Sequence, residues 1–231
     1  MLSSNEFSDW SKQYVAFLHV TTRVDTDKHQ DLLQAKGFRG FPSLCFMDEA
    51  GDVIAKHSGP RTLDGLDGTA SSAGEYLALR ERASTGDAAA TAQMFVKNLE
   101  LGHYSFSDGM LRLAVFASEL DAATVAAAES TLIEVQIQEM AKALRDKDLE
   151  REAYMAQYAE IMSMFFRADR MPSGRTAMNV LMGTMNHAQA NKDVGLFERA
   201  LSRMKQEADG DQRYDRMVSH FENQLQQLRD S

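Results

Sequence analysis

The chain has 231 residues, of which 44% are apolar and 26% are charged, and its formal net charge is −9. A chain of this length and composition can bury a sizeable core in one or two globular domains. The acidic balance argues against a nucleic-acid binder, which usually presents a basic face, and against a basic membrane-surface helix. The single cysteine, Cys45, excludes an internal disulfide, a CxxC pair and a Cys-rich zinc cluster.

The first residues of the chain lack the features of a secretory signal. Residues 1–7 contain neither a basic region nor an apolar stretch, and the longest apolar runs elsewhere are strand-sized. We therefore expect a soluble protein that is cytoplasmic as the sequence is written. If the native start lies upstream of Met1, a periplasmic or exported protein is the expectation instead.

Residues 1–62 mix strand and helix signals, so we expect an α/β module. Ser4 is a suitable cap for a short helix over 5–13, and Gly37 is a suitable end for a helix over 28–36. Apolar and β-branched runs predict three strands, and the acidic, glycine-containing residues between the last two predict a hairpin turn. These strands are expected at 14–21, 43–47 and 53–57, with the turn at 48–52.

The composition changes after this module. Residues 63–73 are rich in Gly, Ser, Asp and Thr and predict a linker. Residues 74–231 have a helical apolar period, and short connections predict antiparallel helical hairpins. The fold class is thus α/β plus all-α. The helices are expected at 74–85, 88–101, 106–118, 121–145, 147–169, 174–191, 193–208 and 212–229.

The order of elements in the first module resembles the C-terminal part of a thioredoxin fold. Residues 37–48, 51–54 and 58–59 carry the resemblance, which covers about residues 5–60. In that family a cis proline opens a strand, and the backbone before it docks extended peptides. Pro42 matches this proline and Phe41 the residue before it, and an X-Pro bond is the kind that adopts cis at low cost. The resemblance implies that Phe41 and Pro42 dock peptides.

The match to the thioredoxin family is incomplete. The family places a strand and a CxxC motif ahead of the segment that residues 5–13 would match, and this sequence has neither, so the redox chemistry cannot be carried over. In the family the absent strand lies between those expected here at 14–21 and 43–47, which leaves two sheet edges open. Three explanations stay open: the native start precedes Met1, three strands suffice in a rearranged sheet, or a partner or second copy supplies the strand.

The helical region resembles tetratricopeptide-type repeats, although no clean 34-residue period appears. Such arrays usually bind peptides or partner proteins on a concave face. A thioredoxin-like module followed by helices of this kind also resembles a group of bacterial thioredoxin-family proteins. The best local match is formed by Ala188, Asp193, Phe197, Ala200 and Leu201, with a second at 86–95.

Cys45 lies in an apolar strand, three residues after Pro42. A nucleophilic thiol needs an electropositive, partly exposed setting, whereas Leu44 and Phe46 on either side argue for burial. We expect a core cysteine, with a reactive thiol as the alternative.

Methionine is unusually frequent, with 14 residues in the chain. Met178, Met182 and Met185 share one helical face. We expect these side chains to fill the contact between helices, because methionine suits irregular gaps in a core. The alternatives are an adaptable protein-binding groove and a Cu(I) site, since Cu(I) is a soft ion that prefers sulfur ligands.

No HExxH, GxGxxG, P-loop or Ser-His-Asp pattern occurs, so we assign no catalytic, cofactor-binding or metal-binding residue. The sequence favours a non-catalytic thioredoxin-like protein that acts as a protein or peptide interaction module, with a homo-oligomer through the open sheet edge as a further possibility. We expect no nucleic-acid or membrane partner. One alternative is a thiol-disulfide oxidoreductase whose CxxC segment lies upstream of this chain. The other is soft-metal binding through the clustered methionines.

Overall fold

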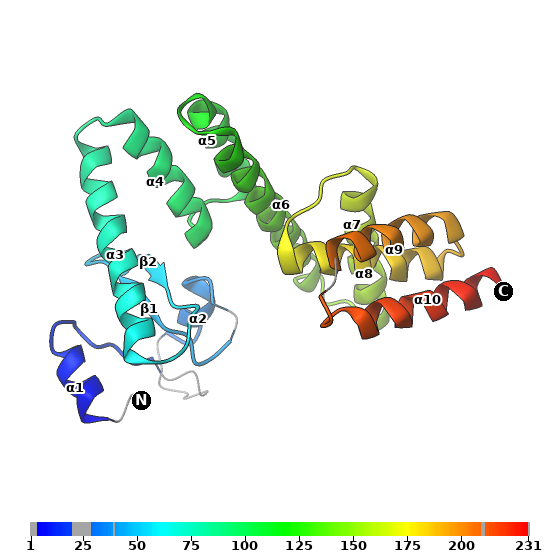
Figure 1. The fold of residues 1–231 in the computed structure, drawn as a ribbon, viewed down its shortest axis with the longest axis horizontal. Coiled ribbons are helices and arrows are strands. Elements are labelled where there is room, and N and C mark those ends of the chain that lie inside the picture. The colour runs from blue at the N-terminus through cyan, green and yellow to red at the C-terminus, as the bar shows by residue number, and fades with distance from the viewer. Residues whose placement is uncertain (1–3, 20–28, 39, 209–210, 231) are drawn as a thin grey trace. The chain divides into compact units, whose positions relative to one another are not determined.

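The chain folds into two compact units that are mostly helical (Figure 1). The N-terminal unit comprises Met1–Tyr104 and Arg112–Asp121, and the C-terminal unit comprises Ser105–Leu111 and Ala122–Ser231. The computed structural model describes residues 4–19, 29–38, 40–208 and 211–230.

Local capping interactions set the ends of several helices in the N-terminal unit. The Ser4 side chain accepts a hydrogen bond from the Phe7 backbone N–H, as expected for the cap of α1. Asp87 caps α4 in the same way, and Gly102 ends that helix with a φ of +81°. The elements are α1 (Asn5–Ser11), α2 (Leu32–Ala35), β1 (Cys45–Met47), β2 (Val53–Lys56), α3 (Leu63–Ser84), α4 (Ala88–Leu101) and the short 3₁₀ helix η1 (Ala117–Glu119).

Strands β1 and β2 form an antiparallel hairpin, which confirms the second and third predicted strands. In the ladder Cys45 pairs with Lys56 and Phe46 with Ala55, and an irregularity follows Phe46. The predicted turn is also present. One carboxylate oxygen of Asp48 accepts hydrogen bonds from the backbone N–H groups of Ala50 and Asp52, which closes the turn.

The strand predicted at 14–21 is wrong over residues 14–19, which form no ladder. Val15, Phe17 and Leu18 are 98%, 64% and 83% exposed, so the segment is also not buried. A high β-propensity reflects packing against neighbouring strands, and the described residues supply no such neighbour here. Residues 20 and 21 lie outside the described part of the chain. Residue 28, the first of the helix predicted at 28–36, also lies outside the described part. Within the predicted range the structure has the shorter helix α2.

The linker predicted at 63–73 is also wrong, because these residues form the first half of α3. The Thr62 side chain accepts a hydrogen bond from the Gly65 backbone N–H and caps the helix. Leu66, Thr69 and Ala73 recur every three or four residues on the buried face. The burial of this face outweighs the low helix propensity of Gly, Ser and Thr.

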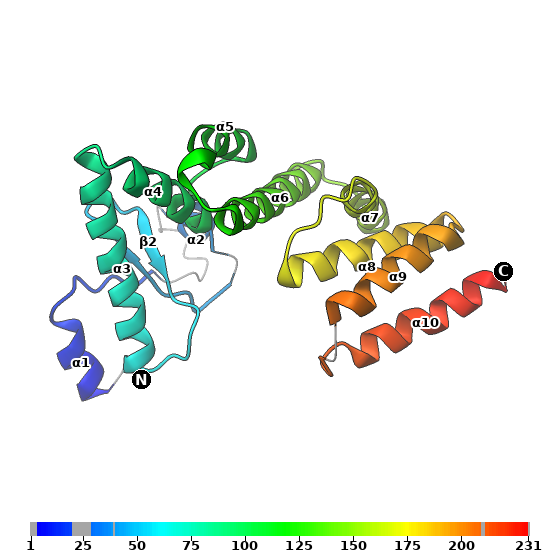
Figure 2. The ribbon, with the colours of Figure 1, turned by 45° about the horizontal axis from the view of Figure 1, so that its top comes forward.

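The core of the N-terminal unit lies where α3 packs against the hairpin and α4 (Figure 2). Ile54 and Ala55 from β2 meet Ala73 and Tyr76 from α3 and Met94 from α4. Rings from the N-terminal segment add to this core at the other strand.

In the C-terminal unit consecutive helices pack against each other: α7 on α8, α8 on α9 and α9 on α10 (Figures 1 and 2). The predicted helices are confirmed, with ends that differ by at most a few residues. Within the described residues, no helix has both the length and the apolar character needed to cross a membrane. The elements are α6 (Ala122–Arg145), α7 (Arg151–Arg167), α8 (Gly174–Ala190), α9 (Val194–Ala208) and α10 (Asp215–Arg229), and α5 (Phe106–Phe116) divides between the two units.

Candidate functional site

The two residues expected to dock peptides are exposed and lie just before β1. Phe41 is 77% exposed, and the Phe41–Pro42 peptide bond is cis, as expected. The Arg61 guanidinium donates a hydrogen bond of 3.0 Å to the Pro42 carbonyl. This hydrogen bond links the residues before the hairpin to the segment that leads into α3. The Phe41 ring remains exposed to solvent.

Cys45 is partly buried on β1, opposite Lys56 in the ladder. Burial raises the pKa of the thiol, and the positive charges of Lys56 and Lys36 offset this effect only in part. A raised pKa keeps the thiol protonated near neutral pH, and a protonated thiol is a poor nucleophile. This setting favours the core cysteine over the reactive thiol.

The three methionines of the predicted cluster lie in or beside the core of the C-terminal unit. Met178 and Met185 are buried, and Met182 is partly buried against the same cluster of side chains. Their neighbours there include Phe197 and Leu201, which are apolar. This environment suits packing. Among the described residues, no group of three His, Cys, Asp or Glu side chains could hold a metal ion.

An exposed apolar segment beside the sheet was not anticipated from the sequence. The rings of Trp10 and Tyr14 lie 6.4 and 5.0 Å from the ring of Phe46 on β1, measured between centroids. The Trp10 indole also donates a hydrogen bond to Asp67 on α3. These contacts hold the start of the segment against the hairpin. The residues that follow, Val15, Phe17 and Leu18, then project into solvent.

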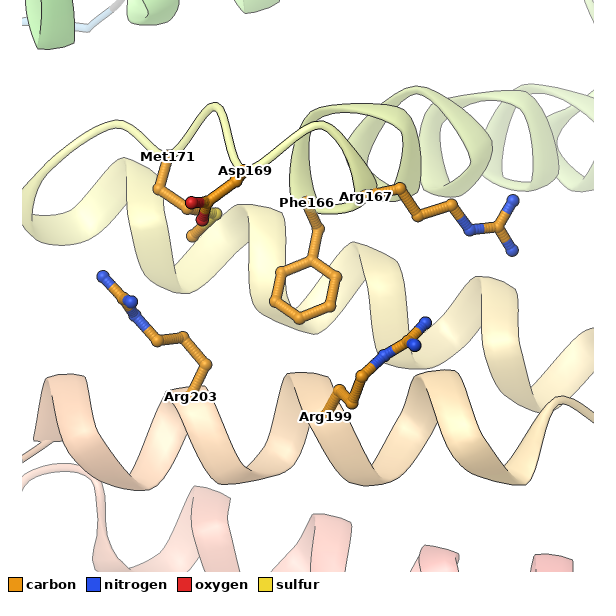
Figure 3. Close-up of a pocket in the computed structure, with 6 residues that line it drawn as sticks. All are labelled: Phe166, Arg167, Asp169, Met171, Arg199 and Arg203. Atoms are coloured by element: carbon orange, nitrogen blue, oxygen red, sulfur yellow. The ribbon is translucent and has the colours of Figure 1, made fainter.

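Sequence analysis also missed a hollow in the C-terminal unit, between the end of α7, the loop after it and α9 (Figure 3). Its volume is about 450 Å³. Three of its lining residues are arginines, contributed by α7 and α9. The lining residues are Phe166, Arg167, Asp169, Met171, Arg199 and Arg203.

The chain matches no protein-family model, no curated protein and no solved structure. The thioredoxin-like and tetratricopeptide-like resemblances therefore stay predictions.

Proposed function

We propose that this protein is an interaction module that binds an extended apolar segment of another polypeptide alongside β1. The observation that carries the proposal is the exposed apolar segment held beside the hairpin. Because the sheet described here has only two strands, β1 pairs with β2 on one edge and has its other edge open. Unpaired backbone groups at such an edge are a template for one more strand.

Addition of a strand would use both the open edge of β1 and the exposed apolar segment beside it. Backbone hydrogen bonds to a sheet edge supply affinity, and alternate side chains of the added segment supply specificity. An added segment would also cover Phe17 and Leu18, and removing such side chains from water contributes about 1.5–3 kcal/mol each. The surface therefore offers the two interactions that an extended peptide needs.

The charge pattern favours an apolar partner. No residue between Lys12 and Arg23 is charged, although the chain as a whole has a net charge of −9. An uncharged segment imposes no repulsion on an apolar strand and offers no attraction to a charged one. Phe41 is a further exposed apolar residue, just before β1.

The thioredoxin-like resemblance points the same way. In that family the backbone before the cis proline docks extended peptides, and Phe41 and Pro42 match that position in the sequence. A second copy of this chain is the competing occupant of the open edge. The test below separates these two occupants.

The test is a titration with a probe peptide of sequence Lys-Val-Thr-Val-Thr-Val-Lys, blocked at both ends. We expect saturable binding that weakens about tenfold or more in Phe17→Glu, because a buried charge would replace an apolar contact. Val115→Glu on α5 is the matched control, since Val115 is 69% exposed and lies on another surface. Absence of binding, or equal weakening by both variants, would contradict the proposal.

The molar mass in solution is measured in the same samples by sedimentation. A monomer that binds the peptide supports the proposal. A dimer that is lost in Phe17→Glu and does not respond to the peptide would mean that a second copy occupies the edge instead.

A further inference from the structure

The hollow around Phe166 combines positive charge with an apolar floor. Phe166 and Met171 are partly buried and pack against the core of the C-terminal unit. In Figure 3 the side chains of Arg199 and Arg203 rise from α9 on either side of the Phe166 ring, and Arg167 extends from the end of α7. Arg199 and Arg203 therefore flank the Phe166 ring, and the Arg167 side chain extends away from it.

Most of the hydrogen-bonding capacity of these arginines is free for a ligand. Among the described residues, no carboxylate forms an ion pair with Arg199. Arg203 uses its Nε–H to donate to Glu207 at 2.8 Å, which leaves both terminal NH₂ groups. Arg167 lies 3.7 Å from Asp193, longer than a hydrogen bond.

The hollow contains one carboxylate of its own, that of Asp169, on the loop side. Outside the lining, Asp193 lies beside Arg167 and Glu207 pairs with Arg203, so the formal charges around the hollow balance. The attraction for an anion comes from the Arg199 guanidinium, which has no ion pair among the described residues, and from the terminal NH₂ groups of Arg203. Guanidinium groups bind carboxylates and phosphates through paired, charge-assisted hydrogen bonds. The ligand class is therefore anionic.

The arrangement of the arginines further restricts which kinds of anion fit the hollow. A single phosphate is best held by guanidinium groups that converge on one point, whereas Arg199 and Arg203 point to opposite sides of the ring (Figure 3). A volume of about 450 Å³ is large for one small anion and lies in the range of organic-ligand sites. Separate anionic groups with an apolar group between them match this layout.

We propose that this hollow is a second binding site, which takes an acidic peptide segment with an apolar side chain between its carboxylates. The apolar side chain would lie on Phe166 and Met171, and the carboxylates would pair with Arg199 and Arg203. This site is in the C-terminal unit and selects a different chemistry from the open edge of β1. It does not depend on the proposed function.

The experiment uses the full chain and a fluorescent, end-blocked peptide of sequence Glu-Asp-Phe-Asp-Glu. We expect saturable binding that weakens about tenfold or more in Arg199→Gln combined with Arg203→Gln, since both removed charges would contact carboxylates. Arg216→Gln on α10 is the matched control, because it removes an exposed positive charge outside the hollow. Arg199→Gln alone is a second variant; it breaks no ion pair among the described residues, so it is expected to fold.

Two further probes decide the ligand class. A peptide with Ser in place of Phe should bind more weakly, because the apolar contact is lost, and Lys-Lys-Phe-Lys-Lys should not bind. Absence of saturable binding, or equal effects of the double variant and Arg216→Gln, would overturn the proposal. Competition by inorganic phosphate together with indifference to the Phe-to-Ser change would also overturn it, in favour of a small-anion site.

Discussion

Met162 on α7 occupies the space in which a side chain on Gly183 of α8 would lie. A Cβ atom placed on Gly183 would be 2.5 Å from Met162 Cγ and 2.6 Å from its Cβ, closer than such atoms approach. The two helices therefore meet at this glycine. Because Met162 is buried and the overlap involves the inner part of its side chain, the methionine cannot simply swing away.

Gly183→Ala is expected to destabilise the protein by about 1–3 kcal/mol, as overpacked core positions do. Gly74→Ala on α3 is the matched control, since a Cβ there has no neighbour within 4 Å. That change should stabilise the helix by up to about 1 kcal/mol. Urea unfolding of both variants measures the two effects, and a stabilising Gly183→Ala would contradict the close helix contact.

The turn between β1 and β2 is fastened to α3 through Asp48. Arg80 donates a hydrogen bond of 2.7 Å to this carboxylate, which also accepts two backbone hydrogen bonds within the turn. Burial alone would raise the pKa of Asp48, but the hydrogen bonds from the Asp52 backbone and Arg80 outweigh it and lower the pKa. Asp48→Ala should therefore lower the free energy of unfolding at neutral pH by about 1–3 kcal/mol.

The pH dependence of this contribution has a definite sign. A carboxyl whose pKa is lower in the folded state stabilises the fold above its unfolded pKa of about 3.9 and loses that contribution as the pH falls. The stability difference between the original chain and Asp48→Ala should thus shrink below about pH 4. Glu49→Ala, which alters a neighbouring exposed carboxylate 3.7 Å from Arg80, should have little effect at any pH.

The clustered methionines should behave as packing residues. Met185→Leu is expected to cost less than about 1.5 kcal/mol, because volume is nearly conserved, whereas Met185→Ala should cost about 2–5 kcal/mol. Thermal unfolding compares the two variants. A Cu(I) titration against a competing chelator is the complementary measurement. Stoichiometric Cu(I) binding that is lost in Met182→Ser would contradict the packing role.

The Cys45 thiol should react slowly with alkylating reagents in the folded protein. Its pKa is raised by burial above the ordinary value of about 8.5, so the thiolate fraction near neutral pH is small. Alkylation of the folded protein by iodoacetamide should become faster as the pH rises above about 8.5. In urea, where the chain is unfolded, alkylation should be fast. Rapid alkylation of the folded protein at neutral pH would indicate a reactive thiol instead.

The end of α3 and both ends of α4 were predictable because they are marked locally. Gly86 and Gly102 adopt positive φ values at the ends of α3 and α4, and Asp87 caps the helix between them. These signals depend on a few adjacent residues, which a sequence shows directly. The antiparallel hairpin was predictable for the same reason, since the Asp48 turn is local.

Features that depend on tertiary contacts were not predictable in this way. Residues 63–73 have the composition of a linker, but they form the first half of α3, a helix that packs against the sheet. The 14–19 segment has strand composition, but the described residues supply no neighbouring strand. Arg167 and Arg199 are far apart in sequence, so only the packing of α7 and α9 through α8 brings them to one hollow.

The central claim is that an extended peptide adds to the sheet beside residues 14–18. Amide hydrogen–deuterium exchange with and without the Lys-Val-Thr-Val-Thr-Val-Lys probe tests it most directly, because strand addition protects the backbone groups that it pairs. The account predicts that the probe slows exchange over 14–18 and 45–47 and leaves α9 and α10 unchanged. Binding of the probe without slower exchange in either segment, or with protection confined to the helices, would contradict it.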